Sequence, residues 1–309
     1  MRGIDEAKAF YLEYGRQMIS ESFPEYEGRI AVGLAGHGSE CFGFDDEISR
    51  DHDFEKGFCL WLTDEDDLKI GVELSRAYRA LPIVRASERS SMAGTKLGVH
   101  RISDFYRRYT GSSGAPESWQ HWLSIPAYAL AEATNGQVWR DDLGLFGRVR
   151  NELLNGMPED VRKKKMAAAA VKMAQAGQYN YSRCLAHGEQ GAAMLALGEF
   201  VKSSCEMAFL LNKAHMPYYK WSFRAMTKLE KLSDLKDALE FLLTGENDPQ
   251  GQKIKQQVIE DICGTVISEL KAQGLSAGNW DYLEPHAFEI QESIEIPEIK
   301  AMHIMTDSL

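Results

Sequence analysis

The chain has 309 residues, of which 44% are hydrophobic and 26% are charged, and its formal net charge is −11. This length and apolar content are sufficient to bury the cores of two domains. The acidic balance argues against a long nucleic acid or an anionic membrane surface as the partner, because binding of either depends on clustered Lys and Arg. No stretch approaches the roughly 20 apolar residues of a membrane span, so we expect no membrane partner.

The cysteines and the N-terminal residues indicate a reducing compartment. The five cysteines are widely spaced and include no Cys-x-x-Cys pair, which argues against a disulfide framework and against a zinc site. The first residues carry charges throughout and lack the apolar core of a secretory signal. We therefore expect a cytoplasmic protein.

The N-terminal part predicts a helix followed by two strands. Residues 4–23 place apolar side chains at helical spacing, which predicts an amphipathic helix. Two apolar runs, residues 28–35 and 54–62, predict strands on either side of a loop rich in glycine and acidic residues. Thr63, followed three residues later by Asp66, predicts the N-cap of a further helix.

The loop between the two predicted strands carries a pattern typical of a nucleoside triphosphate site. Gly38 would let the backbone approach phosphates closely, and Ser39 would offer its hydroxyl and amide to phosphate oxygens. Asp51 and Asp53 alternate along an extended chain, so their carboxylates would share one face about 7 Å apart. Carboxylates so placed can share a Mg²⁺ or Mn²⁺ ion that also binds substrate phosphates. We predict Gly38 and Ser39 as nucleotide-binding residues, and Asp51 and Asp53 as catalytic, metal-binding residues.

A third strand is predicted at residues 97–102, after an irregular loop over residues 83–96. The pleat of this strand offers His100, and no carboxylate, to the predicted site. The residues leave three roles open for His100: a metal ligand, a base, or a polar strand residue with hydrogen bonds of its own. We include His100 among the candidate metal ligands.

The later chain changes from mixed structure to successive helices. Residues 117–134 predict a helix interrupted or bent near Pro126, and residues 137–140 predict a short strand. Asp141 is expected to form a turn, with an approach to the metal as the alternative. From Pro158 onward the pattern is helical. Three parts are therefore predicted, namely residues 1–156, a helical bundle at 157–283 and an acidic C-terminal tail at 284–309.

Taken together, the motif residues resemble the signature of the DNA-polymerase-beta-like nucleotidyltransferase superfamily: Gly38, Ser39, Gly43, Asp51 and Asp53. The string GFDDEISRDHDF and the later strings at residues 177–183 and 217–226 resemble a bacterial family within it, domain of unknown function 4037. The resemblance implies an α+β fold, in which a small mixed-sheet nucleotidyltransferase domain is followed by an all-helical domain.

The resemblance also implies an activity. A metal-dependent nucleotidyltransferase moves a nucleoside monophosphate from a nucleoside triphosphate to an acceptor, here a small molecule or a protein, and releases pyrophosphate. The superfamily usually supplies a third carboxylate, which this sequence does not show at the expected strand. One alternative is therefore a nucleotide-binding sensor or regulatory protein that has lost turnover. Another is an interaction protein whose helical half is the functional part.

Relatives with a helical second domain facing the nucleotide imply a role for two polar-aromatic strings. In this interpretation Lys220 and Arg183 reach phosphates, Arg224 lies beside Lys220 on one helix face, and Tyr179 contacts the base or the acceptor. The residues alone leave open an aromatic core between helices with cations at its edge. The three consecutive lysines at 163–165 are expected to form a solvated helix end.

Overall fold

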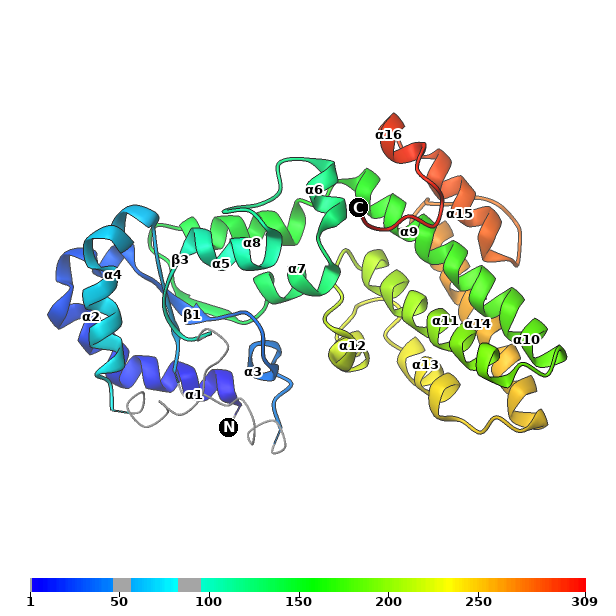
Figure 1. Cartoon of the computed structure of the whole chain (residues 1–309), viewed down its shortest axis with the longest axis horizontal. Helices are drawn as coiled ribbons and strands as arrows, with labels where there is room; N and C mark the ends of the chain where they lie inside the picture. The colour runs from blue at the N-terminus through cyan, green and yellow to red at the C-terminus, as the bar shows by residue number, and fades with distance from the viewer. Residues whose placement is uncertain (1, 47–56, 83–95) are drawn as a thin grey trace. The chain divides into compact units, whose positions relative to one another are not determined.

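The computed structural model describes residues 2–46, 57–82 and 96–309. It confirms the α+β fold, with a four-stranded sheet near the N-terminus followed mostly by helices (Figure 1). The chain forms two compact units. Unit 1 comprises residues 1–117 and 129–156, and unit 2 comprises residues 118–128 and 157–309. None of the described helices combines the length and the apolar run that a membrane crossing needs.

The division into units differs from the predicted one in two segments. Residues 118–128, which include α6 (Trp119–Ser124), belong to unit 2, although they precede unit 1's last helix. Residues 284–309, predicted as a separate acidic tail, are also part of unit 2 and contain most of α15 (Leu283–Glu292) and all of α16 (Pro297–Lys300). The segment belongs to unit 2 because its helices pack on α9, and its acidic composition does not prevent this.

The sheet of unit 1 is mixed and has the order β3-β2-β1-β4. Its strands are β1 (Ala31–Leu34), β2 (Cys59–Leu62), β3 (Gly98–Arg101) and β4 (Gln137–Arg140). β1 pairs antiparallel with β2 and with β4, whereas β2 pairs parallel with β3. Gly33 lies opposite Cys59, so the end of β1 is beside the start of β2. The last residues of β1 and the first residues of β2, the two central strands, therefore lie at the same end of the sheet.

Both faces of this sheet are covered by apolar side chains. One face, which includes Val32 and Leu60, packs in a core with residues of the N-terminal helices and of α4 (Asp64–Arg79). The N-terminal helices are α1 (Gly3–Phe10), the π-helical η1 (Tyr11–Gly15) and α2 (Arg16–Ser22), which confirms the predicted helix; η2 (Pro24–Arg29) follows as a 3-10 helix. The Thr63 side chain accepts from the Asp66 amide at 3.1 Å, which confirms the predicted cap of α4.

The other face of the sheet is covered by two helices from later in the chain. Trp61 of β2 stacks on Phe146 of α8 (Leu145–Asn155), with ring centroids 4.0 Å apart, and meets Phe105 of α5 (Ile102–Thr110) edge on. Offset and edge-on aromatic contacts add to the free energy gained from burial alone. This face carries His100, whose strand partner in β2 is Trp61.

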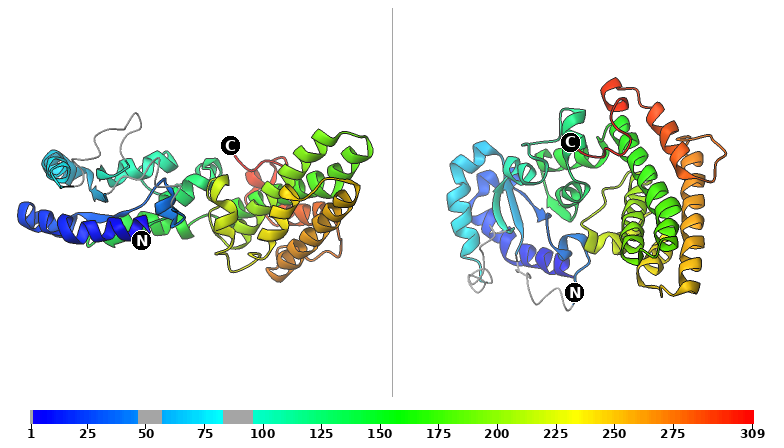
Figure 2. Two further views of the ribbon diagram at one scale, coloured as in Figure 1. Left: turned by 90° about the horizontal axis from the view of Figure 1, so that it is seen from below. Right: turned by 45° about the vertical axis from the view of Figure 1, so that its right-hand side comes forward.

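Unit 2 is a helical bundle (Figures 1 and 2). Its main helices are α9 (Glu159–Met173), the π-helical η5 (Ala174–Tyr181), α10 (Ser182–Ala186), α11 (Gln190–Leu211), α12 (Tyr219–Met226), α13 (Leu235–Thr244) and α14 (Pro249–Ala272). α11 lies alongside α9 and η5, and α15 packs on α9. The alanines at 167–170 are almost fully buried, which permits this close helix packing. Pro126 separates α6 from α7 (Ala127–Thr134), most of which belongs to unit 1, and this confirms the predicted interruption.

The lysines at 163–165 do not form the expected solvated helix end. Lys164 is fully buried, and its ammonium donates to Gln291 Oε1 at 2.8 Å and to the carbonyls of His303 and Ile304. Lys165 donates to the Asp307 carbonyl at 3.0 Å. The prediction was wrong because the C-terminal segment, which is far away in sequence, covers this face of α9 and offers its carbonyl oxygens there.

Candidate functional site

A tight glycine turn follows β1, where the predicted phosphate-binding residues lie. Gly36 and Gly38 have φ values of +113° and +112°, a region that L side chains rarely adopt. Asn135 fastens the turn, because its amide oxygen accepts from the Gly36 amide at 2.8 Å and its amide nitrogen donates to the Gly36 carbonyl at 2.7 Å. The Tyr109 hydroxyl accepts from the His37 amide at 3.2 Å. Hydrogen bonds to Asn135 and Tyr109 therefore attach the turn to other parts of unit 1.

Ser39 begins a single-turn helix, α3 (Ser39–Phe42), directly after Gly38. Gly43 ends this helix with a φ of +67°, and its amide donates to the Glu40 carbonyl. Glycine is the residue that most readily ends a helix in this left-handed conformation. The glycine of the motif at position 43 thus has a structural role that requires no ligand.

The two predicted metal-binding aspartates, Asp51 and Asp53, lie outside the described residues. The described connection ends at Asp46 and resumes at Gly57, two residues before β2. Among the residues that the structure does describe, no group of three or more His, Cys, Asp or Glu could hold a metal ion. Metal binding by Asp51 and Asp53 therefore remains a prediction from the sequence.

An ion pair between Glu40 and Lys96 fills the space beside Gly38. The two side chains are hydrogen-bonded and only 10% and 11% exposed, respectively. A methyl carbon placed on Gly38 would lie 2.6 Å from Glu40 Oε2 and 2.6 Å from Lys96 Nζ. Gly38 is therefore required by its backbone conformation, and any side chain there would also have to displace the ends of Glu40 and Lys96.

The Lys96 ammonium is charged at neutral pH. Burial lowers its pKa, but the negative charge of Glu40 and its hydrogen bond to the ammonium favour the charged form, and the pKa lies above its ordinary value. Burial raises the pKa of the Cys41 thiol far above neutral, so this thiol carries no charge. Burial likewise raises the pKa of Cys59 to about 12. Glu40 is consequently the anion that balances Lys96.

Lys96 is a site residue that sequence reasoning missed. It is the last residue of the polar stretch that was expected to be an irregular loop, and it precedes β3 by a single residue, Leu97. Its only sequence signal is a lone cation next to a predicted strand, and that signal is common on protein surfaces. Its proximity to Gly38 depends on the parallel pairing of β3 with β2, which the local sequence does not specify.

His100 has a hydrogen-bonding partner of its own. Its Nε2 lies 2.9 Å from the Lys96 carbonyl oxygen. Burial lowers the pKa of His100, so the ring is neutral at pH 7 and donates from Nε2 to this carbonyl. Coordination of a metal would then have to use Nδ1. The metal role of His100 remains a prediction, and its structural role is evident.

Two other acidic residues close to predicted strands have structural partners. Asp104, just after β3, is about half exposed and pairs with Arg107 at 2.7 Å. The Asp141 carboxylate accepts from the Gly147 amide at 2.7 Å, and the Asp141 carbonyl accepts from the Gly144 amide. This confirms turn formation as the role of Asp141. Neither residue supplies an evident third metal carboxylate.

Tyr179 and Arg183 form a pair on the surface of unit 2. Arg183 Nη1 donates to the Tyr179 hydroxyl at 3.0 Å, and the guanidinium carbon lies 5.4 Å from the ring centroid. The remaining members of this string are structural: Tyr181 is buried, and Gly177 leaves room for the Phe200 ring. The string therefore combines a packed core with one exposed cation-aromatic pair.

Lys220 and Arg224 lie over a shared aromatic ring. Their charged groups are 5.0 and 5.5 Å from the Trp221 centroid. Tyr219 is 71% exposed and packs on Tyr218, which in turn contacts Tyr128. We call Tyr128, Tyr218, Tyr219, Lys220, Trp221 and Arg224 the aromatic-cation cluster. Cations stacked on aromatic rings of this kind can also contact a nucleobase or a phosphate.

The structure does not bring the Tyr179–Arg183 pair and the aromatic-cation cluster together. α10, which holds Arg183, precedes α11, and α12, which holds Lys220, follows it (Figure 1). α11 has 22 residues, which makes it roughly 33 Å long. The two groups lie at opposite ends of this helix, so they cannot contact the same phosphate.

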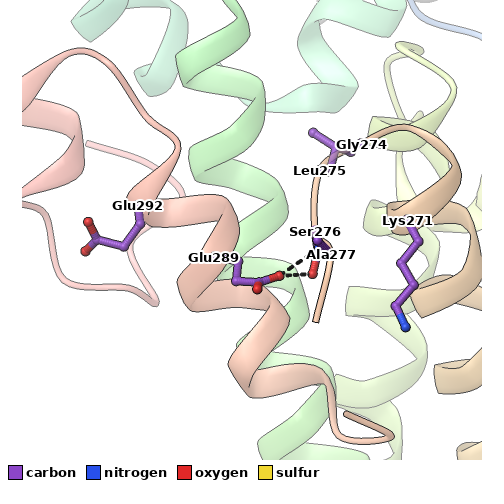
Figure 3. A pocket seen from close by; sticks show the side chains of 7 residues that line it. All are labelled: Lys271, Gly274, Leu275, Ser276, Ala277, Glu289 and Glu292. Atoms are coloured by element: carbon purple, nitrogen blue, oxygen red, sulfur yellow. Dashed lines mark hydrogen bonds between the residues drawn. The ribbon is translucent and has the colours of Figure 1, made fainter. Parts of the chain in front are cut away.

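An open cavity of about 610 Å³ lies between the loop after α14 and helix α15 (Figure 3). The Glu289 carboxylate points to the loop and accepts from the Ser276 hydroxyl and from the Ala277 amide, the latter at 3.0 Å. Lys271 points away from Glu289. None of the predicted site residues lines this cavity, and Glu289 serves to attach the loop to α15.

Comparison with known sequences gives one family. Residues 122–222 match the model of the family described as Domain of unknown function (DUF4037). This confirms the resemblance to that family, and the match includes residues 177–183 and the start of the string at 217–226. It does not include the Gly38–Ser39 turn or Asp51 and Asp53. No curated protein and no solved structure matches the chain.

Proposed function

We propose that this chain, which matches DUF4037 over residues 122–222, is a metal-dependent nucleotidyltransferase. It would transfer a nucleoside monophosphate from a nucleoside triphosphate to a small-molecule or protein acceptor and release pyrophosphate. One observation carries the proposal: the Gly38–Ser39 turn follows β1, is held by hydrogen bonds to Asn135, and lies at the end of the sheet where β2 begins after the stretch of sequence that contains Asp51 and Asp53. This arrangement supports the superfamily resemblance of the sequence motif.

The residues have distinct roles in the proposed reaction. The acceptor attacks the α-phosphorus in line, and pyrophosphate leaves from the opposite side. A bound Mg²⁺ or Mn²⁺ ion would neutralise the charge on the entering and leaving oxygens. Asp51 and Asp53 would hold the ion, and Ser39 would donate its amide and hydroxyl to phosphate oxygens next to Gly38.

The proposed setting is the cytoplasm, and the proposed acceptor is not a long nucleic acid. All five cysteines are free thiols, which supports a reducing compartment. The net charge of −11 disfavours the broad phosphate contacts of duplex binding.

The activity can be tested directly with purified protein. Incubation with Mg²⁺ or Mn²⁺ and each of the four ribonucleoside triphosphates should release pyrophosphate. The double change Asp51→Asn and Asp53→Asn should abolish metal-dependent triphosphate binding without unfolding the protein, because amides are poor ligands for these ions. Asp104→Asn, an exposed carboxylate of the same unit, is the matched control and should bind as the wild type does. Unchanged affinity in the double variant would contradict the assignment.

A nucleotide-binding sensor or regulator is the second candidate. It is favoured by β3, which presents His100 where a third carboxylate is usual, with Nε2 bonded to the Lys96 carbonyl. Metal-dependent triphosphate binding without release of pyrophosphate, across all four nucleotides and several acceptor classes, would support this candidate over the enzyme.

A further inference from the structure

The open side of the Gly38 turn, which a phosphate would need to approach, is occupied by the chain's own ion pair. Glycine permits close approach only where nothing else fills the space. Here Glu40 Oε2 and Lys96 Nζ both lie within 2.6 Å of the point where a side chain on Gly38 would begin. A phosphate oxygen can therefore reach this side of the turn only if the two side chains move apart.

Stability alone does not explain a pair of charges in this position. Removing two charges from water costs free energy that their attraction often does not recover, and apolar replacements of similar size are frequently as stable. Among the residues that the structure describes, the surroundings of this pair offer little further compensation. The nearby Cys41 and Cys59 thiols are neutral, since burial raises the pKa of both, and Glu40 is the acceptor that the structure gives the Lys96 ammonium.

We propose that Lys96 is the phosphate-binding cation of the Gly38–Ser39 turn and that Glu40 pairs with the Lys96 ammonium when no polyphosphate is bound. This inference rests on the proposed nucleotide site and adds to it a residue and an exchange. Lys96 supplies a compact positive charge suited to phosphate oxygens. Glu40 holds that charge in place in the absence of ligand and is released when the more highly charged polyphosphate takes over the ammonium.

The exchange explains why an acidic residue directly follows Ser39. A carboxylate at position 40 would repel phosphate if its charge were uncompensated. Paired with Lys96, it instead acts as an internal competitor, so the apparent affinity is reduced by the fraction of molecules in which Lys96 is not available. Removal of the Lys96 charge should therefore weaken phosphate binding, whereas removal of the Glu40 charge should strengthen it.

The test measures binding of inorganic tripolyphosphate by calorimetry, first in EDTA and then with Mn²⁺. Lys96→Met should weaken binding in EDTA by roughly tenfold or more, because a charge-assisted hydrogen bond is lost. Glu40→Gln should tighten it by roughly threefold or more, because the competitor is removed. Lys96→Arg keeps the charge and should retain part of the affinity. The double variant Glu40→Gln with Lys96→Met should bind as weakly as Lys96→Met alone.

Two controls separate binding from folding. Thermal unfolding shows whether each variant retains its structure, and Lys96→Arg keeps the inference testable should Lys96→Met fail to fold. Lys69→Met removes an exposed lysine of the same unit, which pairs with Glu65 one turn away on α4, and should leave binding unchanged. Wild-type affinity in Lys96→Met would overturn the inference. So would a Glu40→Gln variant that binds more weakly only with Mn²⁺, because Glu40 would then be a metal ligand.

The outcomes also separate this inference from the proposed function. Loss of metal-dependent binding in the Asp51→Asn and Asp53→Asn variant, together with no effect of Lys96→Met, would keep the nucleotide site and reject the role of Lys96. Lys96-dependent tripolyphosphate binding without any nucleotidyl transfer would keep the role of Lys96 and reject the enzyme. Absence of both triphosphate and tripolyphosphate binding in the wild type would reject both.

Discussion

At the scale of single residues, the two glycines of the motif are required for different reasons. Gly38 has a backbone conformation available almost only to glycine, and the Glu40–Lys96 pair crosses its open side. Gly43 ends α3 in the left-handed region, and no atom of the described residues lies within 4 Å of the position that its side chain would take. The same residue type thus answers one constraint at position 43 and two at position 38.

Substitution by alanine should distinguish these two positions. Gly43→Ala should lower the free energy of unfolding by about 1 kcal/mol, which is the cost of the left-handed conformation. Gly38→Ala should lower it by about 2 kcal/mol or more, because its strained conformation is joined by a clash with the ion pair. Urea unfolding of both variants measures the difference. Equal losses would show that the ion pair yields freely to the new methyl group.

The sequence identified part of this site and could not identify the rest. Gly38 and Ser39 could be recognised because a turn motif is local in the chain. Lys96 could not, because it reaches Gly38 through the pairing of β3 with β2, and that pairing is a property of the whole sheet. The same limit applies to His100, whose partner is the carbonyl of Lys96.

At the scale of helices and strands, locally encoded features were predicted well. Thr63 caps α4, the helix is interrupted at Pro126, and β4 spans residues 137–140. Each of these depends on residues close together in sequence. The π-helix η5 was not predicted, because its wider turn accompanies packing of Gly177 against Phe200 of α11, which lies 23 positions later.

The close contact of η5 with α11 gives a prediction for Gly177. A methyl group at this position would lie 2.3 Å from the Phe200 ring. Gly177→Ala should therefore lower the free energy of unfolding by about 1–3 kcal/mol through overpacking. Gly198→Ala in α11 is the matched control. Its methyl group would meet no atom of the described residues within 4 Å, and the change should raise the free energy of unfolding by roughly 0.5–1 kcal/mol. Chemical denaturation of the two variants should show opposite signs; a neutral Gly177→Ala would mean that the ring can shift aside.

At the scale of the whole molecule, attachment of the C-terminal segment depends on buried lysines of α9. Burial lowers the pKa of Lys164 to about 8, against 10.5 for an ordinary lysine. At pH values between these two pKa values, Lys164 is protonated in the unfolded chain and largely deprotonated in the folded one. This residue therefore makes the free energy of unfolding rise with pH in that range. At pH values below the folded pKa, the folded protein retains a buried charge whose direct hydrogen-bond acceptors are neutral, Gln291 Oε1 and two carbonyls, while the Asp307 carboxylate favours the charge electrostatically.

Removal of the Lys164 amine should reduce that pH dependence. The difference in unfolding free energy between pH 7.5 and pH 9.5 should be smaller in Lys164→Met than in the wild type. The variant should also be less stable at every pH, by about 1–3 kcal/mol, because buried acceptors lose their donor. Lys163→Met, in which the lost lysine is about half-buried and donates to a single carbonyl, is the control. Identical pH profiles for wild type and Lys164→Met would show that Lys164 does not titrate in this range.

The chain passes from one unit to the other three times, after residues 117, 128 and 156. Neither unit is therefore an uninterrupted stretch. A cut at residue 156 would leave α6 without α9, although Lys165 of α9 donates to the Leu123 carbonyl of α6. Because each unit consists of two separate stretches of the chain, fusing one continuous stretch to another protein cannot transfer a complete unit. We therefore expect proteins of this architecture to diverge by amino-acid substitution and not by exchange of whole units.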